Sequence, residues 1–340
     1  MKDAHDLFLS PSTDSYDFRE KYSQTVDGYR RYRALRTALD VGLFDILTRP
    51  MTASEIAEQG FDRDMIQLLC DLLVEMGYLG KEGERYTDTE ESALYMNSGS
   101  PLFLGTTYDL LDDSLRSWDL LVPTLRDGRG HYTPMPNRFH YSMTAFGYFS
   151  KGGFIASMMD FMDSVGIRKG SRILDVAGGH GLYSVAMRSR YPDCDITYFD
   201  REVGAEVARS FFKEYDTDIS IITGDYFTGT IPGGFDILLS SFNESACKPE
   251  LVKKMRDALN PGGMVFLRRY HIIVQDPLER LLQTNCMRTG DGKFTRSPRG
   301  QDPEEYEEFE RRMKENGFVL VRMLRADNGT EFKAYVLKED

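Results

Sequence analysis

Cysteine is scarce in this chain, with four residues among 340. They stand at Cys70, Cys194, Cys247 and Cys286, and no two form a CxxC pair. The sequence therefore predicts neither a disulfide framework nor a zinc site, and we expect no bound metal.

Long apolar runs and basic clusters are also missing. No segment approaches the roughly 18 apolar residues that a membrane helix needs, so we expect no membrane association. The opening MKDAHDLFLSPSTDSYDF lacks the basic stretch and apolar segment of a secretory signal, which predicts a cytoplasmic protein. The formal net charge is −12 and no block of Lys or Arg interrupts it, which argues against nucleic acid as a partner.

The first third of the chain has the pattern of a small helical domain. Residues 27–48 place apolar side chains at near-helical spacing, with Gly42 as a break. Thr52 followed by Glu55 is a capping-box signal for a short helix that Gly60 closes. Length alone favours more than this one domain, because one hydrophobic core rarely keeps growing to 340 residues.

A second helix, DRDMIQLLCDLLVEMG, follows at once, and GYLGKEGERYTDT then alternates around a glycine-bearing turn. Three helices and a hairpin in this order predict a winged helix-turn-helix. The helix face that we expect to be buried consists of Met65, Leu68, Leu69, Leu72, Leu73 and Met76.

Beyond Gly170 short apolar segments alternate with helical ones, which is typical of βαβ units and a largely parallel sheet. An Asp327-Asn328-Gly329 turn predicts a final antiparallel hairpin, and Asp302-Pro303 begins a helix that Gly317 ends. The predicted strands are 172–176, 195–200, 219–224, 235–241, 263–270, 318–326 and 331–338.

A glycine-rich turn follows the first of these strands, where residues 173–181 read ILDVAGGHG. Glycine has no Cβ, so the backbone can approach a ligand closely, and the helix that follows offers free amides. Asp200 ends the second strand, 25 residues after Asp175, where it can accept hydrogen bonds from a ribose diol. NAD would suit the same acid, but Ser184 stands where the dinucleotide pattern requires its third glycine.

A third acid, Asp225, opens the segment GDYF after the third strand. Its carboxylate can accept a hydrogen bond from an adenine amino group while Tyr226 or Phe227 covers the ring face. Taken alone, each acid could equally cap a loop or face solvent. Together the three acids indicate an adenosine-containing cofactor.

The motifs DVAGGHG, YFD, GDYF and NPGG, in this order and spacing, resemble the family of S-adenosylmethionine-dependent small-molecule O-methyltransferases with a winged-helix dimerisation domain. LRTALDVGLFDIL, TASEIAEQ and LLCDLLVEMGYL are similar to that dimerisation domain. The resemblance implies a homodimer and an α/β fold: a seven-stranded doubly wound, Rossmann-like sheet preceded by a mainly helical domain. We place the dimerisation domain at 1–100, linker helices that wall a substrate pocket at 101–165, and the cofactor domain at 166–340.

The resemblance also implies that the cofactor is S-adenosylmethionine and assigns residues to its parts. We expect His180, inside the glycine turn, to contact the cofactor or solvent. The residues predicted to bind the cofactor are Asp175, Gly179 and Gly181 at its methionine part, Asp200 at the ribose, Asp225, Tyr226 and Phe227 at the adenine, and Ser240.

The chain departs from the family after the fourth strand. Members commonly carry a His-Asp-Trp-like segment there, whose His takes a proton from a phenol, but this sequence has SSFNES. Glu244 could replace that base only if burial raised its pKa well above roughly 4.3. His271, after the fifth strand, is a second candidate catalytic base. Methyl transfer can also proceed without a base when the nucleophile is held in line.

The acceptor is expected to be a small aromatic or polycyclic metabolite bound by residues of the linker helices and of the segment after the fifth strand. Arg268 and Arg269 suggest an anionic group on it, although strand alternation turns only one of them inward. The residues predicted to contact the acceptor are Met143, Phe146, Arg269, Asn285 and Met287.

Three other functions stay open at this stage. The missing His makes C-methylation of a planar biosynthetic intermediate nearly as plausible as O-methylation. A relative that binds the cofactor but performs non-methylating chemistry is also possible. A DNA-binding metabolite sensor is disfavoured because the candidate recognition helix carries Asp62, Asp64, Asp71 and Glu75 against Arg63.

Overall fold

The computed structural model describes residues 14–242, 248–270, 276–287, 303–326 and 329–338. The chain divides into two compact units, Met1–Phe103 and Leu104–Asp340. Among the described residues, every helix is too short or too polar to cross a bilayer.

The first unit has helices followed by an antiparallel hairpin, as predicted. Its three strands pair in the order β1-β3-β2. The capping box is confirmed: the Glu55 amide donates to Thr52 Oγ1 at 3.3 Å, and the Thr52 amide donates to Glu55 Oε2 at 2.7 Å. The elements are α1 (Ser15–Asp40), α2 (Leu43–Ile46), β1 (Met51–Thr52), α3 (Ala53–Ala57), α4 (Arg63–Glu75), β2 (Leu79–Glu82), β3 (Arg85–Asp88) and α5 (Glu90–Tyr95).

The predicted buried face of α4 is wrong in part. Its buried side chains are Ile66, Cys70 and Leu73, whereas Met65 and Leu68 are 66% and 64% exposed. The helix carries apolar residues around more than half of its circumference, so periodicity alone did not identify the side that packs on the unit's core.

The second unit is a mixed seven-stranded sheet in the order β6-β5-β4-β7-β8-β10-β9, in which β10 pairs antiparallel with both of its neighbours. All seven predicted strands are confirmed, and the fifth begins at Leu259 rather than at 263. The strands are β4 (Arg172–Val176), β5 (Asp195–Asp200), β6 (Ser220–Thr223), β7 (Phe235–Ser241), β8 (Leu259–Tyr270), β9 (Phe318–Arg325) and β10 (Thr330–Leu337).

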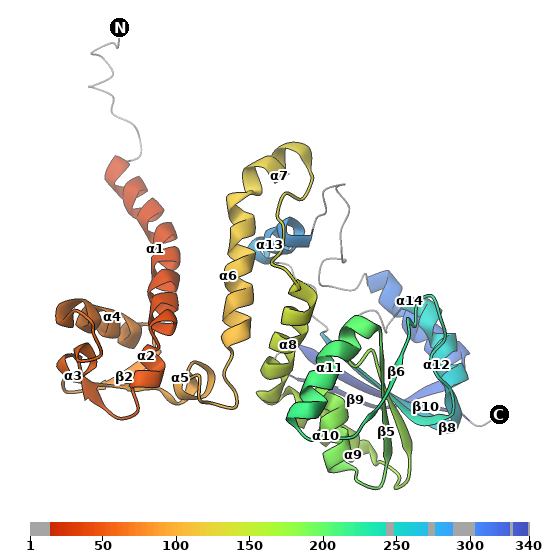
Figure 1. The fold of residues 1–340 in the computed structure, drawn as a ribbon. Helices are drawn as coiled ribbons and strands as arrows, with labels where there is room; N and C mark the ends of the chain where they lie inside the picture. Colours follow the sequence, from red (N-terminus) through yellow and green to blue (C-terminus); the bar gives the residue numbers. More distant parts are fainter. Residues whose placement is uncertain (1–13, 243–247, 271–275, 288–302, 327–328, 339–340) are drawn as a thin grey trace. The chain divides into compact units, whose positions relative to one another are not determined.

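Helices cover both faces of this sheet (Figure 1). One core lies between the sheet and α9, α10 and α11, and a second lies between the sheet and α12 and α14. Gly317, with φ +86°, ends α14 as predicted, whereas Asp302, Asp327 and Asn328 lie outside the described residues. The helices of this unit are α6 (Gly105–Asp119), α7 (Leu121–Asp127), α8 (Arg138–Lys151), α9 (Phe154–Val165), α10 (Leu182–Arg190), α11 (Glu202–Glu214), α12 (Val252–Ala258), α13 (Pro277–Met287) and α14 (Pro303–Glu315).

Candidate functional site

Three neighbouring parallel strands end at one edge of the sheet, and each brings an acid to it. Asp175 lies near the end of β4, Asp200 is the last residue of β5, and Asp225 follows β6. The carboxyl edge of an open parallel sheet is where ligands of α/β folds bind. The structure thus brings together the three acids that the sequence singled out.

In the turn after β4, Gly178 and Gly181 have no room for a Cβ. A Cβ on Gly178 would lie 2.6 Å from the Tyr198 ring, and one on Gly181 would lie 2.8 Å from Ala208 of α11. Gly179 has φ +56°, a left-handed conformation that favours glycine. The turn backbone is therefore packed directly on β5 and α11, beside Asp200.

Asp200 fixes this turn. Its carboxylate accepts hydrogen bonds from the amides of Gly179 at 2.9 Å and Arg201 at 2.7 Å, and the Tyr198 hydroxyl donates to the Gly179 carbonyl at 2.8 Å. Burial raises the pKa of Asp200, and the two amide donors oppose that shift. Each carboxylate oxygen has two lone pairs, so Asp200 can still accept bonds from a diol.

Asp175 is buried more deeply, with 1% of its surface exposed. The Ser184 hydroxyl, from the first turn of α10, donates to it at 2.7 Å. Burial raises the pKa of Asp175 to about 7, so its charge changes near neutral pH. A cation bound at the turn would favour the carboxylate form.

Asp225, Tyr226 and Phe227 differ in their contacts and in how far their side chains are exposed. The Asp225 carboxylate accepts a bond from the Phe227 amide at 2.8 Å, which lowers its pKa. Tyr226 is 7% exposed and belongs to the core under α12 and α14, whereas Phe227 is 41% exposed, with its ring centroid 4.5 Å from that of Tyr226. Of the two rings that the sequence left open, Phe227 is the one with a face available to a ligand.

Ser240, a further predicted cofactor residue, is buried in β7. Its hydroxyl donates to the Val176 carbonyl at 3.2 Å and so ties β7 to the end of β4. The residue lies at the correct edge, and its contact with a cofactor remains a prediction.

His180 does not face solvent, contrary to one of the two contacts expected for it. It is 3% exposed: its Nδ1 accepts the Leu182 amide at 3.1 Å, and its Nε2 lies 3.4 Å from Ser150 Oγ. The turn folds the imidazole inward against Phe146, where burial lowers its pKa to about 3. His180 is therefore neutral at physiological pH.

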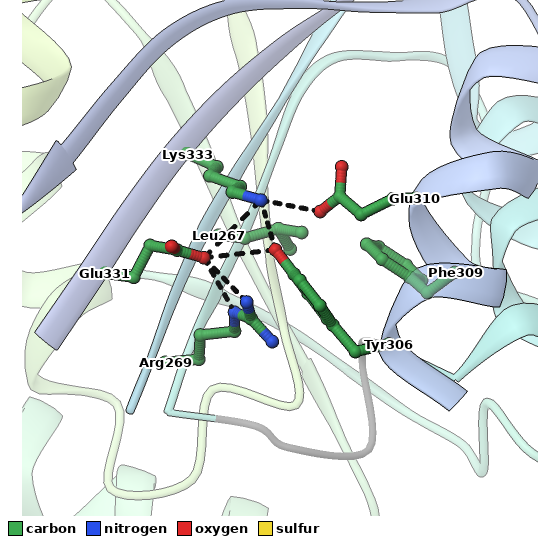
Figure 2. A pocket seen from close by; sticks show the side chains of 7 residues that line it. All are labelled: Leu267, Arg269, Tyr306, Phe309, Glu310, Glu331 and Lys333. Atoms are coloured by element: carbon green, nitrogen blue, oxygen red, sulfur yellow. Dashed lines mark hydrogen bonds and ion pairs between the residues drawn. The ribbon is translucent and has the colours of Figure 1, made fainter. Parts of the chain in front are cut away.

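Both arginines of β8 are buried, on opposite faces of the sheet. Arg269 points toward α14, where its guanidinium donates to Glu331 at 2.7 and 3.0 Å and lies over the Tyr306 ring (Figure 2). The predicted acceptor contact of Arg269 is therefore wrong: strand alternation places the side chain in a buried ionic cluster. Lys333 and Glu310 complete that cluster.

Arg268 faces the other way, toward α9 and α10. It donates to the Phe154 carbonyl at 2.6 Å and the Tyr183 hydroxyl at 2.8 Å, and the Phe242 ring centroid lies 4.2 Å from its guanidinium. Phe242 follows β7 directly and has φ +51°, and its amide donates to the Arg268 carbonyl at 2.7 Å. A strained, bulky residue at a strand's carboxyl end often marks a functional site, and the sequence pattern did not reveal this arginine–aromatic cluster.

The other four predicted acceptor residues lie on two helices. On α8, Met143 Sδ lies 3.5 Å from the position that a Cβ on Gly179 would occupy, and the Phe146 ring packs on Phe242 at 5.6 Å. On α13, Asn285 is buried and donates to the Ser117 carbonyl at 2.7 Å. Met287 ends α13, but its side chain lies outside the described part of the chain, as do Glu244 and His271.

Comparison with known proteins gives concordant findings. A family model described as the O-methyltransferase domain matches residues 154–319, and one described as the O-methyltransferase dimerisation domain matches residues 23–98. Acetylserotonin O-methyltransferase of Gallus gallus is 25% identical over 297 residues, covering 75% of this chain and 81% of the relative. The N,N-dimethyltransferase OxyT of Streptomyces rimosus is 22% identical over 329 residues, covering 90% of this chain and 92% of the relative.

A solved structure of human N-acetylserotonin methyltransferase in complex with SAM superposes with a TM-score of 0.66 at 20% identity, covering 98% of this chain and all of that one. At this identity the likeness shows the fold. The two chains share the architecture of a helical unit followed by a seven-stranded sheet.

Proposed function

The chain belongs to the O-methyltransferase family and is an S-adenosylmethionine-dependent methyltransferase, and we propose that it methylates a hydroxyl group on a small aromatic or polycyclic metabolite. The observation that carries this proposal is the set of three acids at the ends of β4, β5 and β6, beside a turn in which Gly178 and Gly181 have no room for a Cβ. We also propose that the protein works as a homodimer in the cytoplasm, and the match of residues 23–98 to the family's dimerisation domain supports the homodimer.

The site fits the cofactor in three places. Asp200 would hold the ribose diol, Phe227 would stack on the adenine, and Asp225 would accept a bond from its amino group. The turn at Gly179 would approach the methionine part, where Asp175 offers a carboxylate to its ammonium group. When bound, the cofactor supplies an electrophilic methyl group on a sulfonium, which is transferred by in-line displacement.

The described residues supply positioning and shielding from water rather than an evident base. His180 is neutral and buried, the Phe146 ring packs against it, and the Phe242 ring packs on Phe146. Holding the acceptor hydroxyl in line with the methyl group provides much of the rate by itself. Glu244 and His271 stay as proposed bases, to be tested by pH–rate profiles of their Gln variants.

Nitrogen is the second candidate for the methylated atom. OxyT, which aligns with 90% of this chain, is named as an N,N-dimethyltransferase. Incubation with methyl-labelled S-adenosylmethionine and a panel of phenols, catechols and anilines, followed by mass spectrometry, separates the two. The proposal expects labelled methyl ethers, and exclusive labelling of anilines would instead assign the chain to N-methylation.

A further inference from the structure

Helix α8 lies beside α11 (Figure 1) and packs on the glycine turn after β4. A Cβ on Gly147 of α8 would lie 2.9 Å from the Phe211 ring and 3.2 Å from the His180 Cβ, so the helix approaches the turn closely. Met143, about one helical turn earlier, lies beside Gly179. The cofactor turn and the helix predicted to wall the acceptor site are therefore in direct contact.

A chain of hydrogen bonds crosses this contact, and its direction is fixed at both ends. The Leu182 amide can only donate, so His180 Nδ1 accepts from it at 3.1 Å. The Phe146 carbonyl can only accept, so the Ser150 hydroxyl donates to it at 2.7 Å. The neutral imidazole therefore carries its hydrogen on Nε2, which lies 3.4 Å from Ser150 Oγ and donates to it.

These bonds join the turn to α8 through one buried side chain. A neutral imidazole has one donor and one acceptor, and in His180 both are engaged with protein groups. The bond from His180 to Ser150, both of them buried, is the longest of the three. Because hydrogen bonds weaken quickly beyond this length, a small shift of the turn is enough to tighten or break the link.

We propose that His180 is a positioning residue that couples the glycine turn to α8, so that a bound cofactor fixes the wall of the acceptor site. The inference rests on the proposed function, because it takes the cofactor to bind at Gly179 and α8 to line the acceptor site. It deepens that function: the cofactor holds the turn, His180 holds Ser150, and the Phe146 ring is thereby kept in place for the acceptor. Cofactor and acceptor then each raise the affinity for the other.

Hydrogen exchange followed by mass spectrometry tests this coupling without an acceptor. The full chain is exchanged with and without saturating S-adenosylhomocysteine, and the rates are compared for peptides from α8. We expect the ligand to slow exchange in α8 about tenfold in wild type. In His180→Ala and in Ser150→Ala the ligand should still bind, but the slowing in α8 should fall below about twofold. A merely structural role of His180 would speed exchange in both states and leave their ratio unchanged.

Two conservative variants separate the bonds that His180 makes. Glutamine can place its Nε2 near the position of the imidazole Nε2, so His180→Gln should restore most of the slowing. Asparagine is shorter: it can accept from Leu182 but cannot reach Ser150, so His180→Asn should not restore it.

Ser157→Ala is the matched control. The Ser157 hydroxyl donates one helical turn back, to the Gly153 carbonyl at 2.8 Å, as the Ser150 hydroxyl does, but it lies exposed on α9. Its loss should leave the slowing in α8 as in wild type.

Three results would each overturn the inference. They are no slowing in α8 of wild type with the ligand bound, wild-type slowing in His180→Ala or Ser150→Ala, and no more slowing in His180→Gln than in His180→Asn. Failure of S-adenosylhomocysteine to bind wild type would instead overturn the proposed function, and this inference with it.

Discussion

Replacing Glu331 with Gln removes a buried negative charge while preserving the side chain's shape. Glu331 lies on β10 with none of its side chain exposed, between Arg269 at 2.7 Å and Arg325 at 2.8 Å. Burial alone would raise the pKa of its carboxyl, but the hydrogen bonds from the two arginines outweigh burial and lower it to about 2. The folded state therefore favours the ionised form strongly.

The magnitude follows from linkage. A carboxyl whose pKa falls from 4.5 in the unfolded chain to about 2 in the folded one contributes on the order of 3 kcal/mol of stability at neutral pH. Breaking a buried ion pair from one side costs roughly 3–5 kcal/mol, which agrees. We therefore expect Glu331→Gln to lower the free energy of unfolding by about 3 kcal/mol at pH 7.

Urea unfolding at several pH values tests this. The stability that a carboxyl with a lowered pKa contributes is fully present above about pH 4.5 and is lost as the pH falls through about 2. The stability difference between wild type and Glu331→Gln should therefore shrink over that range, while affinity for S-adenosylhomocysteine at pH 7 stays unchanged. The control is Glu308→Gln, whose partners Arg311 and Arg312 are exposed, so this substitution should change the stability far less than Glu331→Gln does.

A difference below about 1 kcal/mol at pH 7, or one that does not change with pH, would refute this account of the Glu331 cluster. Loss of cofactor affinity in Glu331→Gln would also contradict it, because the cluster lies on the face of the sheet that packs against α14.

Three further predictions concern the cofactor edge. Gly178→Ala places a Cβ 2.6 Å from the Tyr198 ring, so urea unfolding should show a loss of about 1–3 kcal/mol, and an unchanged midpoint would contradict the packing described. Phe227→Ala should weaken S-adenosylhomocysteine binding several-fold by calorimetry with little loss of stability, whereas Tyr226→Ala, in the core, should cost about 3 kcal/mol. Because the pKa of Asp175 is raised to about 7, its contribution to the stability of the cofactor-free protein should fall as the pH rises from about 4 to about 7 and then level off. The stability of Asp175→Asn, followed by thermal unfolding, should not show this decrease as the pH rises. An identical pH profile in the variant and in wild type would contradict the raised pKa of Asp175.

The sequence predicted the architecture well because local signals and burial agreed. The strands of the second unit are short apolar runs bounded by turn residues, and the capping box at Thr52 and Glu55 needs only its own helix to form. The sequence also predicted that three acids lie at one edge of the sheet, because each stands within or just after a parallel strand and parallel topology alone gathers them.

The sequence failed where the identity of the packing partner decides a side chain's environment. Alternation separated Arg268 from Arg269 but could not tell which face of β8 meets α14, so the sequence did not reveal that Arg269 lies in the buried ionic cluster. The burial of His180, which rules out its expected contact with solvent, was not predicted because nothing local indicates that the turn folds its ring inward. The partner of Asn285 lies 168 positions away on α6, a separation that no spacing argument reaches.

Calorimetric titration with S-adenosylmethionine and S-adenosylhomocysteine tests most directly whether the acids at the ends of β4, β5 and β6 form a cofactor site. Hydrogen bonds to a charged group contribute about 1.5–3 kcal/mol. Asp200→Ala should therefore lower the affinity for both ligands by at least about tenfold. Saturable binding by wild type with that loss in the variant is the predicted result. Absence of binding by wild type, or equal affinity in Asp200→Ala, would contradict it.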